Sequence, residues 1–160
     1  MSDPRTESEA RRLDTSLESE GAEFLVLGNL LVEGIQAFKA YTNFPGYDLI
    51  ATNAEKNLSC RIQVKSRFAT DFDGGFPIKN LDCDFVVFVA LNRGYRYRRK
   101  KHGDDTGRRD PDFYVFPVEV VREARRPEST WNKVFLRHMD GAKEYVSRWD
   151  LIRSYLELEG

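Results

Sequence analysis

Hydrophobic and polar positions change their period along the chain, and these changes mark the predicted elements. From about Ser16 to Val32 or Glu33, apolar residues recur at helical spacing, and Gly34 follows where a helix can end. Residues 35–41, 47–53 and 58–67 instead show the short apolar runs and alternation of strands, with polar turns between them. The first half is therefore predicted to be one helix followed by three strands.

The second half contains the most apolar run of the chain, CDFVVFVALN at residues 83–92, which predicts a buried central strand. Residues 68–82 look irregular, with Gly74 and Gly75 as a flexible tip. A short strand is expected to end at Phe116, with a helix opened by Pro117. The remaining segments, WNKVFLRHM and SRWDLIRSYLELEG, predict a strand and a closing amphipathic helix. This order indicates an α/β sandwich with helices packed on a mixed sheet.

The length of 160 residues fits one domain. We expect that domain to span residues 16–160. Residues 1–15 lack apolar periodicity and predict a mobile N-terminal tail or a loosely docked helix.

Charge is unevenly distributed, although the formal net charge is only −1. A value so near zero argues against an indiscriminate polyanion binder. Residues 93–109, RGYRYRRKKHGDDTGRR, nevertheless hold eight basic and two acidic side chains, a local charge of +6. This loop is either simply solvated or contacts nucleic-acid phosphates. The candidate phosphate contacts in it are Arg96, Arg98, Arg99, Lys100 and Lys101.

Location is constrained by what the sequence does not contain. No apolar run approaches the ~20 residues of a membrane span, and the N-terminus is polar and acidic, unlike a signal peptide. Cys60 and Cys83 have neither the number nor the spacing of a disulfide framework or a zinc site. We expect a cytoplasmic protein with reduced cysteines and no membrane partner.

Candidate chemistry centres on the two strands at residues 47–53 and 58–67. Gln63 and Lys65 share one strand face, and Asp48 stands at the start of the preceding strand. If these strands pair as a hairpin, Asp48 lies beside the far end of its partner. A carboxylate and an amide oxygen can ligate Mg²⁺, and a neighbouring lysine can orient or deprotonate an attacking water.

In these residues the chain resembles the PD-(D/E)XK, or restriction-endonuclease-like, nuclease superfamily. The motif would be Asp48 in PGYDL, followed by Gln63, Val64 and Lys65 in IQVKS. The later segments look like those of the small archaeal-resolvase-like and homing-endonuclease-like branches. The resemblance covers about residues 16–138 and implies a three-layer sandwich with a mixed central sheet flanked by helices.

The resemblance also implies the site. Asp48 would be the central metal ligand, with Gln63 and Glu23 of the first helix completing a site for Mg²⁺ or Mn²⁺, and Lys65 would position the attacking water. Gln63 stands where the usual motif has an acid. Arg61 and Arg67, beside this site, could contact phosphate.

Three functions fit the sequence. The first is a metal-dependent endonuclease acting on DNA, for which a homodimer is one possible arrangement. The second is a catalytically inactive nuclease-fold module that binds nucleic acid or a protein partner. An α/β interaction domain with no nucleic-acid role is a third reading. Nothing in the sequence matches a phosphate-binding Walker loop, a dinucleotide fingerprint or an acyl-hydrolase elbow.

Overall fold

A computed structural model of the chain describes residues 4–40, 46–70, 75–96, 103–125 and 132–159, with side chains from residue 16 onward. A mixed five-stranded sheet forms its centre, in the order β1-β2-β3-β5-β6. Only β3 and β5 pair in parallel; the other neighbours are antiparallel. The strands are β1 (Gln36–Lys39), β2 (Leu49–Asn53), β3 (Leu58–Arg67), β5 (Phe85–Ala90) and β6 (Asp112–Pro117).

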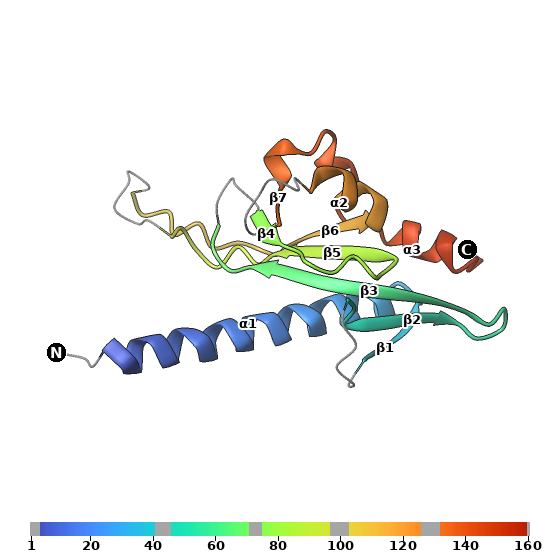
Figure 1. Cartoon of the computed structure of the whole chain (residues 1–160), viewed down its shortest axis with the longest axis horizontal. Coiled ribbons are helices and arrows are strands. Elements are labelled where there is room, and N and C mark those ends of the chain that lie inside the picture. The colour runs from blue at the N-terminus through green and yellow to red at the C-terminus, as the bar shows by residue number, and fades with distance from the viewer. Residues whose placement is uncertain (1–3, 41–45, 71–74, 97–102, 126–131, 160) are drawn as a thin grey trace.

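One face of the sheet packs against two helices, α1 (Pro4–Val32) and α3 (Trp149–Tyr155). Ala22, Val26 and Leu30 of α1 are fully buried there. The other face packs against α2 (Val118–Ala124) and a small antiparallel pair, β4 (Gly75–Pro77) with β7 (Lys133–Phe135). Two 3₁₀ turns, η1 (Leu136–His138) and η2 (Ala142–Tyr145), follow β7. Figure 1 shows α1 on one side of the sheet, with α2, β4 and β7 on the other.

The predicted α/β three-layer sandwich with a mixed central sheet is therefore confirmed. Strand β3 has the predicted bounds, and β5 lies inside the apolar run at residues 83–92. Gly34 ends α1 as predicted. It adopts a φ of 77°, and the Ile35 N–H returns to the Leu30 carbonyl, as in a Schellman motif.

Helix α1 differs from the prediction because it begins at Pro4 rather than near Ser16. The backbone of residues 4–15 thus continues the helix, which agrees with the helical alternative for this segment. In Figure 1 this part of α1 extends beyond the sheet. A helix segment that extends beyond the sheet has no need of apolar periodicity, so the pattern could not reveal it. The mobility of the tail stays a prediction.

The region predicted to be irregular contains β4, so that part of the prediction is wrong. Gly75 is buried in this strand, and a Cβ there would lie 2.8 Å from the Phe135 ring. Gly74 lies outside the described residues. Strand β7 is also shorter than WNKVFLRHM predicts. It ends at Phe135, which lies opposite Gly75 at the start of β4, and the chain then turns into η1.

Candidate active site

Asp48 lies in a bend immediately before β2, where three strands come together. Its backbone N–H donates to the Ile62 carbonyl at 2.8 Å, and its carbonyl accepts from the Ala40 N–H at 2.9 Å. Its Oδ2 accepts a hydrogen bond from the Val64 N–H, also at 2.8 Å. The carboxylate therefore lies at the edge of β3 beyond the start of β2, beside the middle residue of the Gln-x-Lys segment.

Gln63 and Lys65 share the face of β3 that α2, β4 and β7 cover, because side chains alternate along a strand. The amide oxygen of Gln63 accepts a weak hydrogen bond from the Cys83 thiol, with 4.0 Å between Oε1 and Sγ. Cys83 is buried in that layer. Gln63 therefore lies near Asp48 in the ladder, but its amide oxygen has Cys83 as its partner.

Burial raises the pKa of Asp48 and is the largest influence on it. The Val64 hydrogen bond and the positive charges of Lys65 and Lys39 act in the opposite direction and lower that pKa. The ammonium of Lys65 is therefore within electrostatic range of the Asp48 carboxylate. The structure thus brings these two predicted residues together.

Glu23 of α1 lies within electrostatic range of the same carboxylate. Burial, first, and then the negative charge of Asp48 raise the pKa of Glu23 to about 7, against the opposing effect of Lys39. Glu20, one turn earlier, instead forms an ion pair with Lys39, whose side chain is only 8% exposed and whose Nζ lies 4.4 Å from the Phe24 ring centre. Glu23 is therefore coupled to Asp48, and also to Lys39 and Glu20.

The donor set fits a hard divalent cation. Two partly buried carboxylates repel each other when both are charged, and a cation that lies between them removes this repulsion. The Val64 carbonyl lies on the same edge as Asp48, because the N–H and C=O of one strand residue point to the same side. Across the described ranges, no group of three or more His, Cys, Asp or Glu side chains could hold a metal ion. Water and neutral oxygens would therefore complete the octahedron, as Mg²⁺ prefers.

The predicted phosphate contacts divide into three groups. The guanidinium of Arg61 lies 2.8 Å from Asp82 and 3.6 Å from Asp84, so two carboxylates offset its charge. Arg67 and Arg96 line a pocket at the end of β3. Residues 98–101, which carry the predicted contacts Arg98, Arg99, Lys100 and Lys101, lie outside the described residues.

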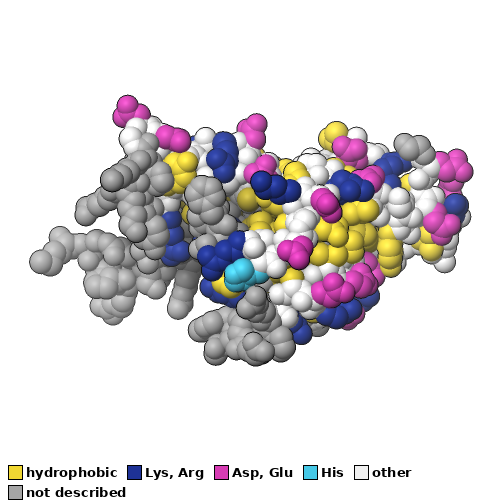
Figure 2. Space-filling view, turned by 90° about the horizontal axis from the view of Figure 1, so that it is seen from above, with side chains coloured by type: hydrophobic (Ala, Val, Ile, Leu, Met, Phe, Trp, Pro, Cys, Tyr) yellow, Lys and Arg dark blue, Asp and Glu magenta, His cyan; other side chains and the backbone are white. Residues whose placement is uncertain are grey.

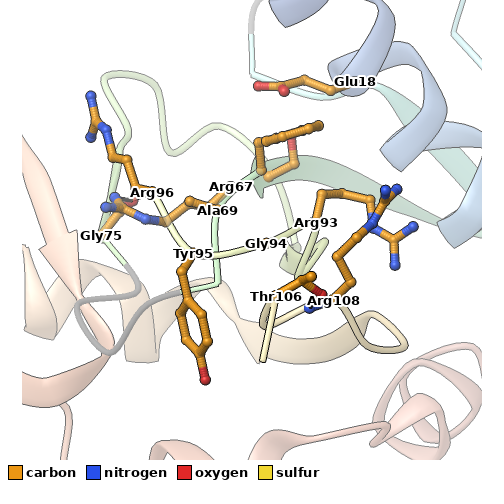
Figure 3. A pocket seen from close by; sticks show the side chains of 12 residues that line it. Glu18, Arg67, Ala69, Gly75, Arg93, Gly94, Tyr95, Arg96, Thr106 and Arg108 are labelled. Atoms are coloured by element: carbon orange, nitrogen blue, oxygen red, sulfur yellow. Dashed lines mark hydrogen bonds between the residues drawn. The ribbon is translucent and has the colours of Figure 1, made fainter. Parts of the chain in front are cut away.

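The pocket that Arg67 and Arg96 line has a volume of about 680 Å³, and we call it the arginine pocket. It is bounded by Glu18 of α1, by the end of β3 with the residues after it, and by Gly75 of β4. The first and last parts of the connection between β5 and β6, which we call its two legs, complete the boundary. Figure 3 shows four arginines around it. They are Arg67, Arg93, Arg96 and Arg108. The pocket follows directly from the candidate site, because Ser66 and Arg67 come next after Lys65 along the chain.

The surface over α2 has a different character. Figure 2 shows acidic, basic and apolar side chains interspersed over this part of the molecule. On this face, therefore, the basic side chains do not form a continuous patch.

Lys39, Arg93 and Arg108 were missed as individual site residues by sequence reasoning. Lys39 had one available signal, because it is a lysine inside a mostly apolar predicted strand. Arg93 and Arg108 belong to the predicted basic loop, but only the isolated bridge between them, which joins the two legs, distinguishes them from its other cations.

Comparisons with known proteins were made at the levels of sequence and structure. No family model matches the sequence, and no curated protein matches it. A bacterial homing endonuclease, I-Ssp6803I, matches in structure with a TM-score of 0.57 and 20% identity, over 88% of this chain and 92% of that chain. Hjc, a Holliday junction resolvase from the archaeal hyperthermophile Archaeoglobus fulgidus, matches at 17% identity and a TM-score of 0.48, over 76% and 87% of the two chains.

The second match is too distant to carry an argument, so the assignment depends on the homing endonuclease and on the topology. The resemblance predicted from Asp48, Gln63 and Lys65 is confirmed at the level of fold: the chain has the restriction-endonuclease-like nuclease fold.

Among the helices whose residues are described, none has the length and apolar character needed to cross a membrane.

Proposed function

We propose that this protein is a metal-dependent endonuclease that hydrolyses DNA phosphodiester bonds. The observation that carries the proposal is the hydrogen bond from the Val64 N–H to the Asp48 carboxylate. It holds an acidic side chain at the edge of the strand that also presents Lys65, with Glu23 opposite on α1. The structural likeness to a homing endonuclease supports the same activity.

Each residue has a distinct role in this proposal. Asp48 and Glu23 would hold Mg²⁺, with Mn²⁺ as a substitute, and the bound cation would supply Lewis-acid activation of water and phosphate. The Val64 N–H fixes the orientation of the Asp48 carboxylate. Lys65 donates hydrogen bonds from its ammonium to the attacking water and offsets the negative charge that develops on the phosphate.

The test is a cleavage assay with Mg²⁺ or Mn²⁺ on plasmid, linear and branched DNA. Asp48→Asn keeps the shape of the side chain and an oxygen that can accept from Val64, but it removes the charge. We expect it and Lys65→Gln to lower cleavage to the level seen with EDTA. Asp82→Asn is the matched control, because Asp82 is an exposed acid that pairs with Arg61. Cleavage by Asp48→Asn at the parent rate would overturn the site.

A second function is favoured by one observation. Gln63 stands at the usual acidic position and, being an amide, supplies no charge to the site. Its amide oxygen also accepts a hydrogen bond from Cys83. This favours a nuclease-fold module that binds nucleic acid without cutting it. If the parent cuts no substrate in the panel yet binds DNA in a salt-sensitive way, this second function holds and the first is wrong.

A further inference from the structure

The arginine pocket has a rim built from three backbone segments that hydrogen-bond to one another. The Thr70 N–H donates to the Gly94 carbonyl at 2.9 Å, and the buried Thr70 hydroxyl donates to the Gly107 carbonyl at 2.6 Å. The Tyr95 N–H donates to the Thr106 carbonyl at 2.9 Å. These bonds join the segment after β3 to both legs of the connection between β5 and β6. The rim is therefore held in place before any ligand arrives, which lowers the cost of binding.

Two arginines of the pocket keep their positive charge available. The guanidinium of Arg93 donates to the Leu91 carbonyl at 3.2 Å and to the Arg109 carbonyl at 2.9 Å, which orients it without neutralising it. Neither Arg93 nor Arg108 forms an ion pair with a carboxylate in the part of the chain that the structure describes. Planar guanidinium groups bind phosphate through paired N–H donors. The pocket thus has the chemistry of a phosphate site.

An aromatic ring lies in the same pocket. It belongs to Phe68, which is 51% exposed. An exposed aromatic face beside arginines provides a platform on which a nucleic-acid base can stack while its phosphate is held. A base inside a duplex already has neighbours on both faces, so only an unpaired base can use such a platform.

We infer that the arginine pocket binds one unpaired nucleotide of the DNA, with the phosphate on Arg93 and Arg108 and the base on Phe68. The inference rests on the proposed function and names its substrate class: duplex DNA with a single-stranded end or branch. Arg67 lies about 7 Å along β3 from Lys65. The bound nucleotide would therefore be a close neighbour of the phosphate to be cut.

The test measures binding without cleavage, by fluorescence anisotropy of the full chain in EDTA. Three labelled probes are compared: a blunt duplex, the same duplex with a short thymidine extension, and a longer blunt duplex with as many phosphates as the extended one. We expect the parent to prefer the extended probe over both blunt probes. Phe68→Ala should lower this preference by about tenfold, because base–aromatic stacking contributes about that much.

The arginines are expected to change a different observable. Arg93→Gln and Arg108→Gln should each weaken binding of the extended probe and lower its salt slope by about 0.7 per lost phosphate contact. Phe68→Ala should leave that slope unchanged. Phe38→Ala is the matched aromatic control, since Phe38 on β1 is 48% exposed, and Arg122→Gln on α2 is the matched cationic control. Neither control should alter the preference or the slope.

The outcomes separate this inference from the proposed function. Equal affinity for the extended probe and the phosphate-matched blunt probe overturns the nucleotide pocket, even if the protein cuts DNA. An unchanged preference in Phe68→Ala also overturns it. A preference that Phe68→Ala removes supports the pocket, even if Mg²⁺ and Mn²⁺ elicit no cleavage.

Discussion

At the scale of single residues, Gln63 is where the proposed metal site departs from the usual acidic motif. A carboxylate holds a hard cation better than an amide does. Gln63→Glu should therefore increase the rise in melting temperature that Mn²⁺ or Mg²⁺ produces, relative to the parent. The measurement is thermal unfolding with and without each ion.

Gln63→Ala is the control, because it also removes the contact with Cys83 without adding a charge. A metal-induced rise no larger in Gln63→Glu than in Gln63→Ala would show that position 63 does not face the cation. If Gln63→Glu gains cleavage that the parent lacks, the glutamine marks a site that has lost its chemistry.

Glu23 predicts a pH dependence of stability in metal-free protein. Burial and the charge of Asp48 raise the pKa of Glu23 from 4.5 to about 7 in the folded chain. Between these values the folded chain binds a proton that the unfolded chain has released, so this residue lowers the free energy of unfolding as pH rises. Glu23→Gln cannot titrate. The free energy of unfolding of Glu23→Gln, relative to that of the parent, should therefore increase from about pH 4.5 to about pH 7 and stay constant above that.

Chemical denaturation in EDTA across this pH range measures the difference. Glu33→Gln, at an exposed position just after α1, reports the general effect of removing one negative charge. A difference between Glu23→Gln and the parent that stays constant with pH would contradict the raised pKa of Glu23.

The sequence revealed those residues whose placement follows from local alternation. Gln63 and Lys65 share a face in any strand, and a short turn is enough to return Asp48 to their neighbourhood. Lys39 and Arg93 could not be placed in the same way. Lys39 joins the site through Glu20 of α1, and Arg93 joins its pocket through a pairing with Arg108 across a long connection.

At the scale of elements, the local sequence pattern predicts β5 but not β4. Six consecutive apolar residues predict β5 because a strand buried on both faces needs no alternation. Strand β4 has three residues and exists through its pairing with β7, far along the chain. No local pattern carries that information, which explains why residues 68–82 looked irregular.

Two glycine substitutions are expected to have opposite effects on stability, because one glycine packs against β7 and the other has open space around it. Gly75→Ala would place a Cβ 2.8 Å from the Phe135 ring, so we expect it to lower the free energy of unfolding by about 1–3 kcal/mol. Gly21→Ala adds a Cβ in open space on α1, and should raise that free energy by up to about 1 kcal/mol. Urea denaturation measures both, and Gly75→Ala with Phe135→Leu should recover stability. A neutral Gly75→Ala would contradict this packing.

At the scale of the whole molecule, the outer face of α1 is the feature that the monomer leaves unexplained. Leu17, Phe24 and Leu31 lie seven residues apart and are 71%, 51% and 52% exposed, and Val32 beside them is 86% exposed. They point away from Ala22, Val26 and Leu30, which face the sheet. This apolar stripe runs for about 22 Å along the helix. Exposed stripes of this kind mark interaction sites.

The homodimer expected from the sequence would bury this stripe against a second copy of itself. Two α1 helices related by a two-fold axis would cover the stripe on both copies, and a standard interface needs about 800 Å² from each. The exposed Phe38 of the adjacent edge strand could extend the contact. We therefore predict a dimer whose mass, measured by light scattering, falls to that of a monomer in a Leu17→Glu, Leu31→Glu variant. Phe68→Ala, at a comparably exposed aromatic residue that is not part of the stripe, should remain a dimer. A parent that is monomeric at every concentration, or a double variant that still dimerises, would show that α1 has another partner or that the dimer uses another surface.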